Sequence, residues 1–186
     1  LRHRVIPLFH GQSAGLVPDE VGARIKDLHL SNAARNITRA EEVRRLDGRF
    51  RDAGVPLLFL RGPVLAASVY GDLSLRQFSD LDLLVRPRYV PAAARVLASE
   101  GYRPQFSLDD AQERALIRFR TERCFIRAGD RSVVDLHWQL LPRFFSFEDE
   151  EPLWTRSVEL NIESANLRTL GKEDLFLFLC VHGAKH

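Results

Sequence analysis

The chain has no methionine, only two cysteines, and only three lysines among its 27 basic residues. Cys124 and Cys180 are too few for a disulfide framework and lack a zinc-binding spacing, so we expect a reducing, cytoplasmic environment. Methionine is missing even at position 1, and residues 181–186 end inside an apolar helical pattern. We therefore expect a piece of a longer protein, or a sequence from which the methionine positions are missing. The arginine preference carries little functional weight, because the base composition of a genome can produce it.

Long apolar runs are also absent. The longest, Leu175 to Val181, is far too short to span a bilayer, and residues 1–7 lack the apolar stretch of a secretory signal, so no membrane partner is expected. A net charge of +2 argues against a nucleic-acid coat protein. With 45% hydrophobic and 28% charged residues, the 186-residue chain is typical of a globular protein of about one domain.

The first third of the chain predicts an arm or loop over 1–18 and a helix from Asp19 to about Ala53. The arginines of this helix are expected to form a solvated face paired with nearby acids, and a nucleic-acid-binding face is the alternative. Its apolar residues recur at intervals of three to five: Val21, Ile25, Leu28, Ala33, Ile37, Ala40, Val43, Leu46 and Phe50.

From Val55 onward, short apolar segments replace the long helical pattern. Their order predicts an α/β (α+β) domain whose mixed sheet is flanked by helices. We expect an N-terminal arm and helix (1–53), an α/β core (54–170) and the start of a C-terminal helical region (171–186). The expected strands are 56–60, 80–85, 117–127 and 132–138, with weaker strand signal in 158–170, and the expected helices are 64–70, 91–100 and 172–186.

Two carboxylates lie two positions apart in one predicted strand. Asp80 and Asp82 therefore project from the same face and repel each other unless a positive group lies between them. A divalent cation meets this need, since Mg²⁺ takes one or two carboxylates and keeps phosphate and water oxygens for its other positions. A solvated sheet face near the start of the strand is the alternative.

A third carboxylate lies in the strand 132–138. Asp135 and His137 share one face there, and a carboxylate in an apolar strand is costly to bury without a partner. If this strand lies beside Asp80 and Asp82, three carboxylates converge into a two-metal site suited to phosphoryl or nucleotidyl transfer. For His137 itself, a structural hydrogen bond is favoured over metal ligation.

A glycine between a strand and a helix start lets a phosphate approach backbone N–H groups, which makes Gly62 a phosphate-loop candidate. Arg61 and Arg76 are placed to neutralise a triphosphate, although a plain turn with two surface arginines is the alternative. His182 and His186 have an i, i+4 zinc spacing but lack the glutamate of a zinc protease, so a supporting or packing role is favoured.

An ordered set of short motifs resembles the uncharacterised nucleotidyltransferase family of bacteria, within the DNA polymerase beta-like superfamily. The resemblance covers the chain from about Val55 to its end. It rests on Leu60-Arg-Gly62, Tyr70-Gly-Asp72, Leu75-Arg76, Asp80-Leu-Asp82-Leu-Leu-Val85, Gly101-Tyr102, Val134-Asp-Leu-His-Trp138 and His182-Gly-Ala-Lys-His186.

The resemblance implies a nucleotidyltransferase-like fold that transfers a nucleoside monophosphate from a triphosphate such as ATP to an acceptor hydroxyl. It implies Asp80, Asp82 and Asp135 as catalytic metal ligands for Mg²⁺, in a two-ion site with Mn²⁺ as the alternative ion. The acceptor is a small molecule, a protein or an RNA, and the part that binds it is expected beyond His186. The nucleotide-binding candidates are Arg61, Gly62, Arg76, Ser79 and His137.

Two departures from the superfamily pattern favour a rival reading. Pro63 replaces the usual glycine or serine after Gly62, and the sixteen residues 64–79 form a longer spacer than is common. These departures motivate a non-catalytic module that keeps the fold and binds a nucleotide, an RNA or a partner protein. Phosphoester hydrolysis at the same carboxylates is a third possibility.

Overall fold

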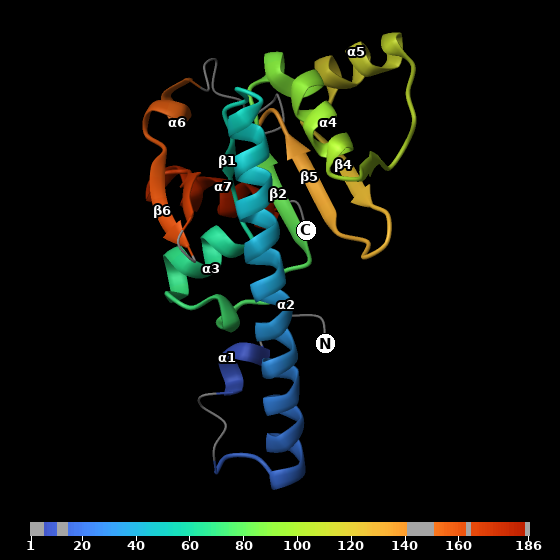
Figure 1. Cartoon of the computed structure of the whole chain (residues 1–186). Helices are drawn as coiled ribbons and strands as arrows, with labels where there is room; N and C mark the ends of the chain where they lie inside the picture. Colours follow the sequence, from blue (N-terminus) through green and yellow to red (C-terminus); the bar gives the residue numbers. More distant parts are fainter. Residues whose placement is uncertain (1–5, 11–14, 141–150, 163–164, 185–186) are drawn as a thin grey trace.

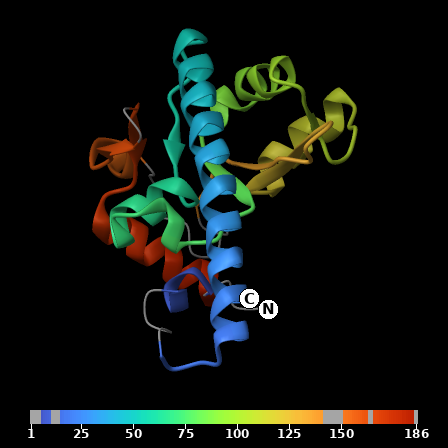
Figure 2. The same cartoon turned by 60° about the horizontal axis from the view of Figure 1, so that its bottom comes forward.

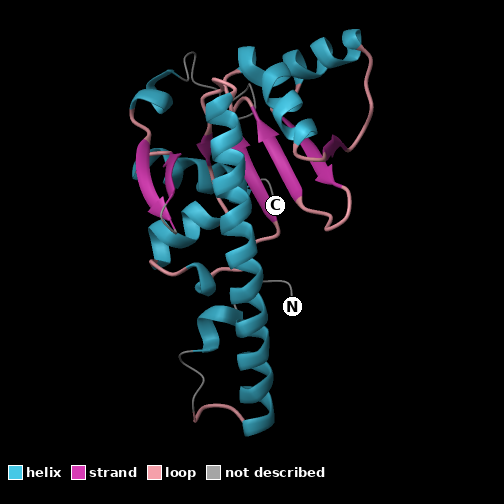
Figure 3. Ribbon diagram, in the orientation of Figure 1, coloured by secondary structure: helices cyan, strands magenta, loops and turns pink. Residues whose placement is uncertain are grey.

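A seven-stranded mixed sheet in the order β3-β4-β5-β2-β1-β7-β6 forms the centre of the molecule. The computed structural model describes residues 6–10, 15–140, 151–162 and 165–184. Figure 1 shows the long helix α2 in front of the sheet and α7 behind it, and Figure 3 shows the strands between helices. This arrangement confirms the predicted α/β class with a mixed sheet flanked by helices.

The helices and strands alternate along most of the chain. The helices are α1 (Ile6–His10), α2 (Asp19–Asp52), α3 (Pro63–Tyr70), α4 (Val90–Ser99), α5 (Asp110–Phe119), α6 (Glu151–Thr155) and α7 (Lys172–Ala184), with 3₁₀ turns η1 (Leu73–Leu75) and η2 (Pro87–Tyr89). The strands are β1 (Leu58–Phe59), β2 (Asp80–Leu84), β3 (Tyr102–Pro104), β4 (Glu122–Arg127), β5 (Val133–His137), β6 (Val158–Ile162) and β7 (Ala165–Thr169).

The strands β2 and β5 are parallel neighbours near the middle of the sheet. Their register sets Asp80 opposite Val133 and Asp82 opposite Asp135. Antiparallel pairing of β1 with β2 and of β4 with β5 extends the sheet on both sides. The acidic strands that the sequence predicts therefore lie side by side.

Alternation along β2 divides the core into two clusters. Leu81 and Leu83 point to the face covered by α2 and α4, where they pack with Leu46 and other apolar residues. The opposite face carries Asp80, Asp82 and Leu84, and there Leu84 packs with residues of α6 and α7. The polar residues of β2 thus share the face that α7 approaches.

The first half of α2 differs from the predicted apolar face. Ile37 is 60% exposed and Val21 is 45% exposed, while Asn32 and Asn36 are buried. Figure 2 shows that this half extends beyond the sheet, with α1 and the segment after α3 beside it. The predicted face holds only in the second half, where the sheet supplies an apolar partner.

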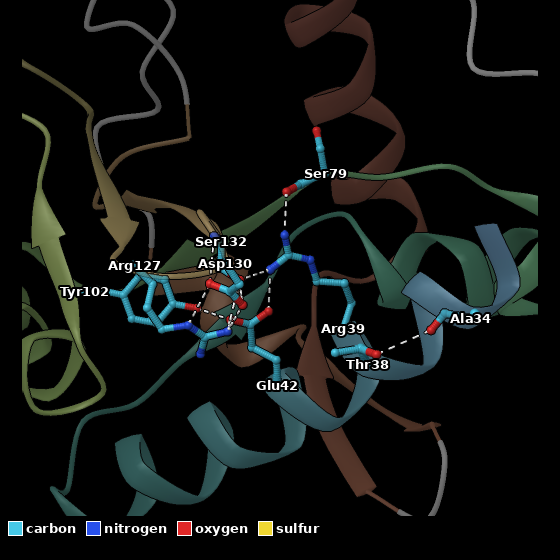
Figure 4. Close-up of polar contacts among 9 residues, drawn as sticks. All are labelled: Ala34, Thr38, Arg39, Glu42, Ser79, Tyr102, Arg127, Asp130 and Ser132. Atoms are coloured by element: carbon cyan, nitrogen blue, oxygen red, sulfur yellow. Dashed lines mark hydrogen bonds and ion pairs between the residues drawn. The ribbon is translucent and has the colours of Figure 1, made fainter. Parts of the chain in front are cut away.

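A buried glutamate joins α2 to the β3–β4–β5 region (Figure 4). Oε2 of Glu42 accepts from Arg39 at 2.5 Å, and Oε1 accepts from the Tyr102 hydroxyl and lies 2.8 Å from Arg127. Burial and the Glu42 carboxylate raise the pKa of Tyr102, so its hydroxyl stays a donor. Arg39 also donates to the hydroxyl of Ser132, next to the start of β5.

The arginines of α2 pair largely as predicted, but partly with residues outside the helix. Arg51 pairs with Asp47 at 2.5 Å, whereas Arg45 and Arg49 both pair with Glu100 after α4. These contacts favour the predicted solvated and paired face over a nucleic-acid surface.

Three other expectations need correction. Residues 6–10 form α1 rather than part of a loop, because this segment packs against α2. The predicted strand 117–127 begins only at Glu122, since residues up to Phe119 belong to α5. The start of α5 is fixed by a capping box in which Asp109 and Gln112 bond each other's backbone. The strand predicted over 56–60 is paired only at Leu58–Phe59.

None of the helices in the described part of the chain is both long and apolar enough to cross a bilayer. The 34-residue α2 has sufficient length but carries charged residues throughout, and the apolar α7 has only 13 residues. A crossing needs about 20 mostly apolar residues.

Replacing Glu42 with alanine should cost about 3 kcal/mol of unfolding free energy, because it leaves Tyr102 and two arginines without their buried acceptor. Urea unfolding followed by circular dichroism measures the change. The adjacent, exposed Glu41 is the matched control, and Glu41→Ala should change stability by less than about 0.5 kcal/mol. Equal effects of the two substitutions would contradict the role assigned to Glu42.

Candidate functional site

Three aspartates meet at the neighbouring strands β2 and β5. One carboxylate oxygen from each of Asp80, Asp82 and Asp135 lies within 4.8 Å of the others, and Asp82 is the buried member. The parallel register of the strands produces this cluster, because it sets Asp82 beside Asp135 on the same face. The predicted convergence of three carboxylates is therefore confirmed.

Asp82 is only 2% exposed and is held by two cationic side chains. Arg61 bonds both of its oxygens, with Nε at 2.8 Å from Oδ2, and Nε2 of His137 lies 3.3 Å from Oδ1. Burial by itself raises the pKa of Asp82, but the bonds from His137 and Arg61 outweigh burial and lower it below its ordinary value. Asp82 is therefore a stable buried carboxylate.

Arg61 follows β1 and connects the cluster to α7. Its Nη1 lies 2.5 Å from Nε2 of His182, and its Nη2 lies 4.0 Å from Asp80. Because a guanidinium only donates hydrogen bonds, His182 accepts through Nε2 and carries its proton on Nδ1. The motif histidine on α7 therefore contacts the site through Arg61, in agreement with the predicted supporting role.

His137 lies between two carboxylates. Besides Asp82, it contacts Glu122 with 3.0 Å between Nδ1 and Oε2. Burial lowers the pKa of His137, but its bonds to Asp82 and Glu122 prevail and raise it to about 9. The Phe178 ring meets the His137 ring edge-on, with 6.5 Å between centroids. His137 therefore makes the structural hydrogen bond that the sequence favours.

Asp135 lies in a different environment from Asp82. Burial raises the pKa of its carboxyl, the negative charges of Asp82 and Asp80 add to this effect, and a hydrogen bond with Cys124 opposes it. Burial and the proximity of Asp135 in turn raise the pKa of the Cys124 thiol to about 12. The pKa values of the neighbouring Asp82 and Asp135 carboxyls are thus shifted in opposite directions.

The residues before α3 and β2 border the cluster. Gly62 has φ 65°, and a Cβ at this position would lie 3.5 Å from the carbonyl oxygen of Asp80, so the turn favours glycine. The Ser79 hydroxyl donates to Oδ1 of Asp80 at 3.2 Å. The structure thus places Gly62 and Ser79, two of the five predicted nucleotide-binding residues, beside Asp80.

Arg76 is partly buried at the end of the η1 segment. Its guanidinium interacts electrostatically with Arg61, Asp80 and Asp82, and burial followed by the Arg61 charge lowers its pKa. Among the residues that the structure describes, no hydrogen-bond partner is found for its buried Nη1. Arg76 thus lies within electrostatic range of Asp80 and Asp82, with one buried donor atom unpaired among the described residues.

The chemistry of the three carboxylates fits a divalent metal ion. Mg²⁺ and Mn²⁺ are hard cations that prefer oxygen ligands, and Asp80, Asp82 and Asp135 each supply one oxygen within 4.8 Å of the others. The donor set contains no cysteine or histidine of the kind that selects zinc. His186, the second histidine of the predicted spacing, lies outside the described residues.

Glu122 and Cys124 are site residues that sequence reasoning missed. The β4–β5 pairing sets Glu122 opposite His137 and Cys124 opposite Asp135. The predicted hairpin already paired the strands that carry these residues. Which residues face each other depends on the register, and the register depends on the turn, in which Arg131 has the unusual φ of 56°.

A cavity of about 500 Å³ lies away from the carboxylates, between the end of α2, the following turn and the strands β6 and β7. Asp47 and Arg51 line it and pair with each other at 2.5 Å, while Glu159 and Arg168 line its other side. The charges on its wall are mixed and select no ligand, so the functional assignment rests on the carboxylate cluster.

Similar solved structures identify the fold. The antibiotic-resistance factor ANT(2'')-Ia matches with a TM-score of 0.58 and 14% identity over 81% of this chain and 74% of that chain. A crystal structure of ANT(2'')-Ia in complex with adenylyl-2''-tobramycin matches with a TM-score of 0.57 and 15% identity, over 80% of this chain and 78% of that chain. The lincomycin-bound lincosamide antibiotic adenylyltransferase LnuA matches with a TM-score of 0.53 and 14% identity, over 74% of this chain and 84% of that chain. The fold is thus that of the nucleotidyltransferases.

The family follows from the sequence match. A family model described as "Uncharacterised nucleotidyltransferase" matches residues 1–186, and the chain belongs to this family. The resemblance seen in the motifs is therefore confirmed. No match was found among curated protein sequences.

The Arg61–Asp82 pair predicts strong coupling in stability. Arg61→Gln and Asp82→Asn should each cost about 3 kcal/mol, because each leaves a buried charge without its partner. The double variant should cost about 2 kcal/mol less than the sum of the two.

Urea unfolding of the four proteins in EDTA measures this coupling without metal ions. Additivity within about 0.5 kcal/mol would contradict the pairing.

Proposed function

We propose that this protein transfers a nucleoside monophosphate from a nucleoside triphosphate, such as ATP, to an acceptor hydroxyl, with Mg²⁺ as its cofactor and Mn²⁺ as the alternative ion. The observation that carries the proposal is the meeting of Asp80, Asp82 and Asp135 within 4.8 Å on two neighbouring strands. Membership of a nucleotidyltransferase family over the whole chain supports it.

Asp80, Asp82 and Asp135 would hold the metal, which supplies Lewis-acid stabilisation of the phosphate charge and orientation of the reacting oxygens when bound. A pair of ions suits the count of carboxylates and matches the two-ion site expected from the sequence. Within this set, Asp82 is kept ionised by Arg61 and His137.

The triphosphate would lie near Gly62 and Arg76. Gly62, whose φ of 65° favours glycine, forms the turn beside Asp80, and the guanidinium of Arg76 would bond a phosphate oxygen. Ser79 would keep Asp80 oriented through its hydroxyl, and His137 would do the same for Asp82. Together these residues would bind and position the triphosphate. Positioning and electrostatic stabilisation supply most of the catalysis in phosphoryl-group transfer.

In the transfer step, the acceptor oxygen forms a bond to the α-phosphorus while the bond from that phosphorus to the leaving pyrophosphate breaks. The hydroxyl proton passes to Asp135, the third carboxylate of the cluster, which lies on the strand next to Asp80 and Asp82. The similar proteins ANT(2'')-Ia and LnuA were solved with an adenylylated antibiotic and with an antibiotic, respectively. They favour a small molecule over a protein or an RNA as the acceptor class here.

The second candidate function is a non-catalytic module that binds a nucleotide or another partner. Pro63 favours it, because this residue opens α3 and removes one backbone N–H from the turn that follows Gly62. Nucleotide binding without transfer distinguishes such a module from the enzyme.

Asparagine at both Asp80 and Asp82 should lower nucleotidyl transfer at least about 1,000-fold, because the site loses two of its three negative ligands. Transfer of an α-³²P-labelled nucleotide and release of pyrophosphate measure the rate. Asp52→Asn, at the exposed end of α2, is the control and should leave the rate within about twofold.

The single variant Asp80→Asn keeps the bonds between Asp82 and Arg61 and therefore separates chemistry from folding. Transfer that continues unchanged in the folded double variant would rule out this mechanism.

Replacing Arg76 with alanine should weaken triphosphate binding about 10- to 100-fold, which corresponds to one or two charge-assisted hydrogen bonds. Calorimetry with ATP, GTP, CTP and UTP in the presence of MgCl₂ gives the dissociation constants. Arg35→Ala, on the exposed surface of α2, is the matched control. An unchanged constant in the Arg76 variant would exclude the assigned role, and lack of binding of all four nucleotides by the wild type would exclude the proposed enzyme.

A further inference from the structure

Two buried asparagines of α2 hold the segment that carries Arg76. Asn32 and Asn36 are 2% and 1% exposed and lie four residues apart, on one face of the helix. Their side-chain amides donate to the carbonyl oxygen of Arg76, with Nδ2 to O distances of 3.4 Å from Asn32 and 2.8 Å from Asn36. Both therefore fix the backbone of the proposed phosphate-binding residue.

The same amides also bond the 3₁₀ turn before Arg76. Asn32 donates to the Ser74 carbonyl at 2.9 Å, and Asn36 donates to the Leu73 carbonyl at 2.5 Å. A single 3₁₀ turn leaves such carbonyls without backbone partners, so their pairing with α2 fixes the path of the turn. The Asp72 carboxylate fixes its start by accepting from the Ser74 N–H at 2.7 Å.

A third residue of α2 continues the contact along the segment. Arg39, three positions after Asn36, donates to the Ser79 carbonyl at 3.3 Å and also bonds Glu42 (Figure 4). The helix thus holds the segment both at Arg76 and at Ser79, directly before the first aspartate of the cluster. Figure 2 shows this segment passing along the middle of α2.

The burial of the two asparagines has an energetic cost. Among the described residues, neither Asn32 Oδ1 nor Asn36 Oδ1 has a hydrogen-bond partner, and an unpaired buried acceptor is destabilising. Among the same residues, the Nη1 donor of Arg76 is likewise buried and unpaired. Because burying Asn32 and Asn36 lowers the stability of the fold, we explain their presence by the segment that they position.

We infer that Asn32 and Asn36 are positioning residues for triphosphate binding, which act by holding the Arg76 backbone so that its guanidinium faces the phosphates. The inference rests on the proposed function, since it assigns Arg76 a phosphate ligand. With these two residues, α2 contributes to nucleotide binding, although none of its residues belongs to the carboxylate cluster.

A double-mutant cycle between Asn36 and Arg76 tests the inference. The probe is inorganic tripolyphosphate with MgCl₂, measured by calorimetry, because it has the phosphates without any base. Asn36→Ala should raise the dissociation constant about tenfold when Arg76 is present and by less than about twofold in the Arg76→Ala background. Asn36→Gln, which retains the amide donor, should restore part of the affinity.

Thr38→Ala is the matched control, because Thr38 is exposed on the same helix and, among the described residues, its side chain bonds only the Ala34 carbonyl, at 3.4 Å. It should leave the dissociation constant unchanged. Hydrogen exchange of residues 73–79 should become faster in Asn36→Ala and stay unchanged in Thr38→Ala.

The possible outcomes separate this inference from the proposed function. Equal losses of affinity with and without Arg76, or unchanged affinity in Asn36→Ala, would overturn the inference while wild-type binding still supports the function. If the wild type binds neither tripolyphosphate nor any nucleoside triphosphate, the proposed function fails and the inference fails with it, whatever the exchange data show.

Discussion

The buried carboxylate of Asp82 is the constraint on which the arrangement of this protein depends. A charge on a central strand, 2% exposed, is tolerated only with partners of opposite sign. Arg61 provides one from the end of β1, and His137 provides another from β5. Each partner is itself held, since Arg61 contacts His182 on α7 and His137 contacts Glu122 on β4. Four separate elements are thus fixed around one carboxylate.

The two faces of the sheet differ in the side chains that they carry. On one face, Leu81 and Leu83 pack under α2 and α4 and supply apolar burial. On the other, Asp80, Asp82 and Asp135 form the acidic cluster toward α7. The helix α2 nevertheless contributes to the geometry of the site, because Asn36 and Arg39 near its middle hold the backbone that leads into β2. The hydrogen bonds and ion pairs of Glu42 hold that same stretch of α2 against the β4–β5 hairpin. The same contacts therefore stabilise the fold and fix the geometry of the site.

Much of the site could be predicted from the sequence, because it depends on alternation along strands. Two aspartates two positions apart must share a face, and a third joins them once β2 and β5 are neighbours. The contribution of α2 could not be predicted in this way. Periodicity indicated Ile37 as an apolar contact, but it is exposed, and Asn36 is buried instead, because the partner of this half-helix is a turn with unpaired carbonyls rather than the sheet. The position of Glu122 depends on the register of the hairpin, which depends on the turn at Arg131 and not on alternation along the strands.

The central assignment is that Asp80, Asp82 and Asp135 bind divalent metal together with a triphosphate. The most direct measurement is anomalous diffraction from crystals grown with MnCl₂ and a non-hydrolysable nucleoside triphosphate analogue. Manganese peaks between the three carboxylates, with the phosphates on the side of Gly62 and Arg76, are the expected result. A bound analogue with no anomalous peak at these aspartates, or manganese held elsewhere, would contradict the assignment.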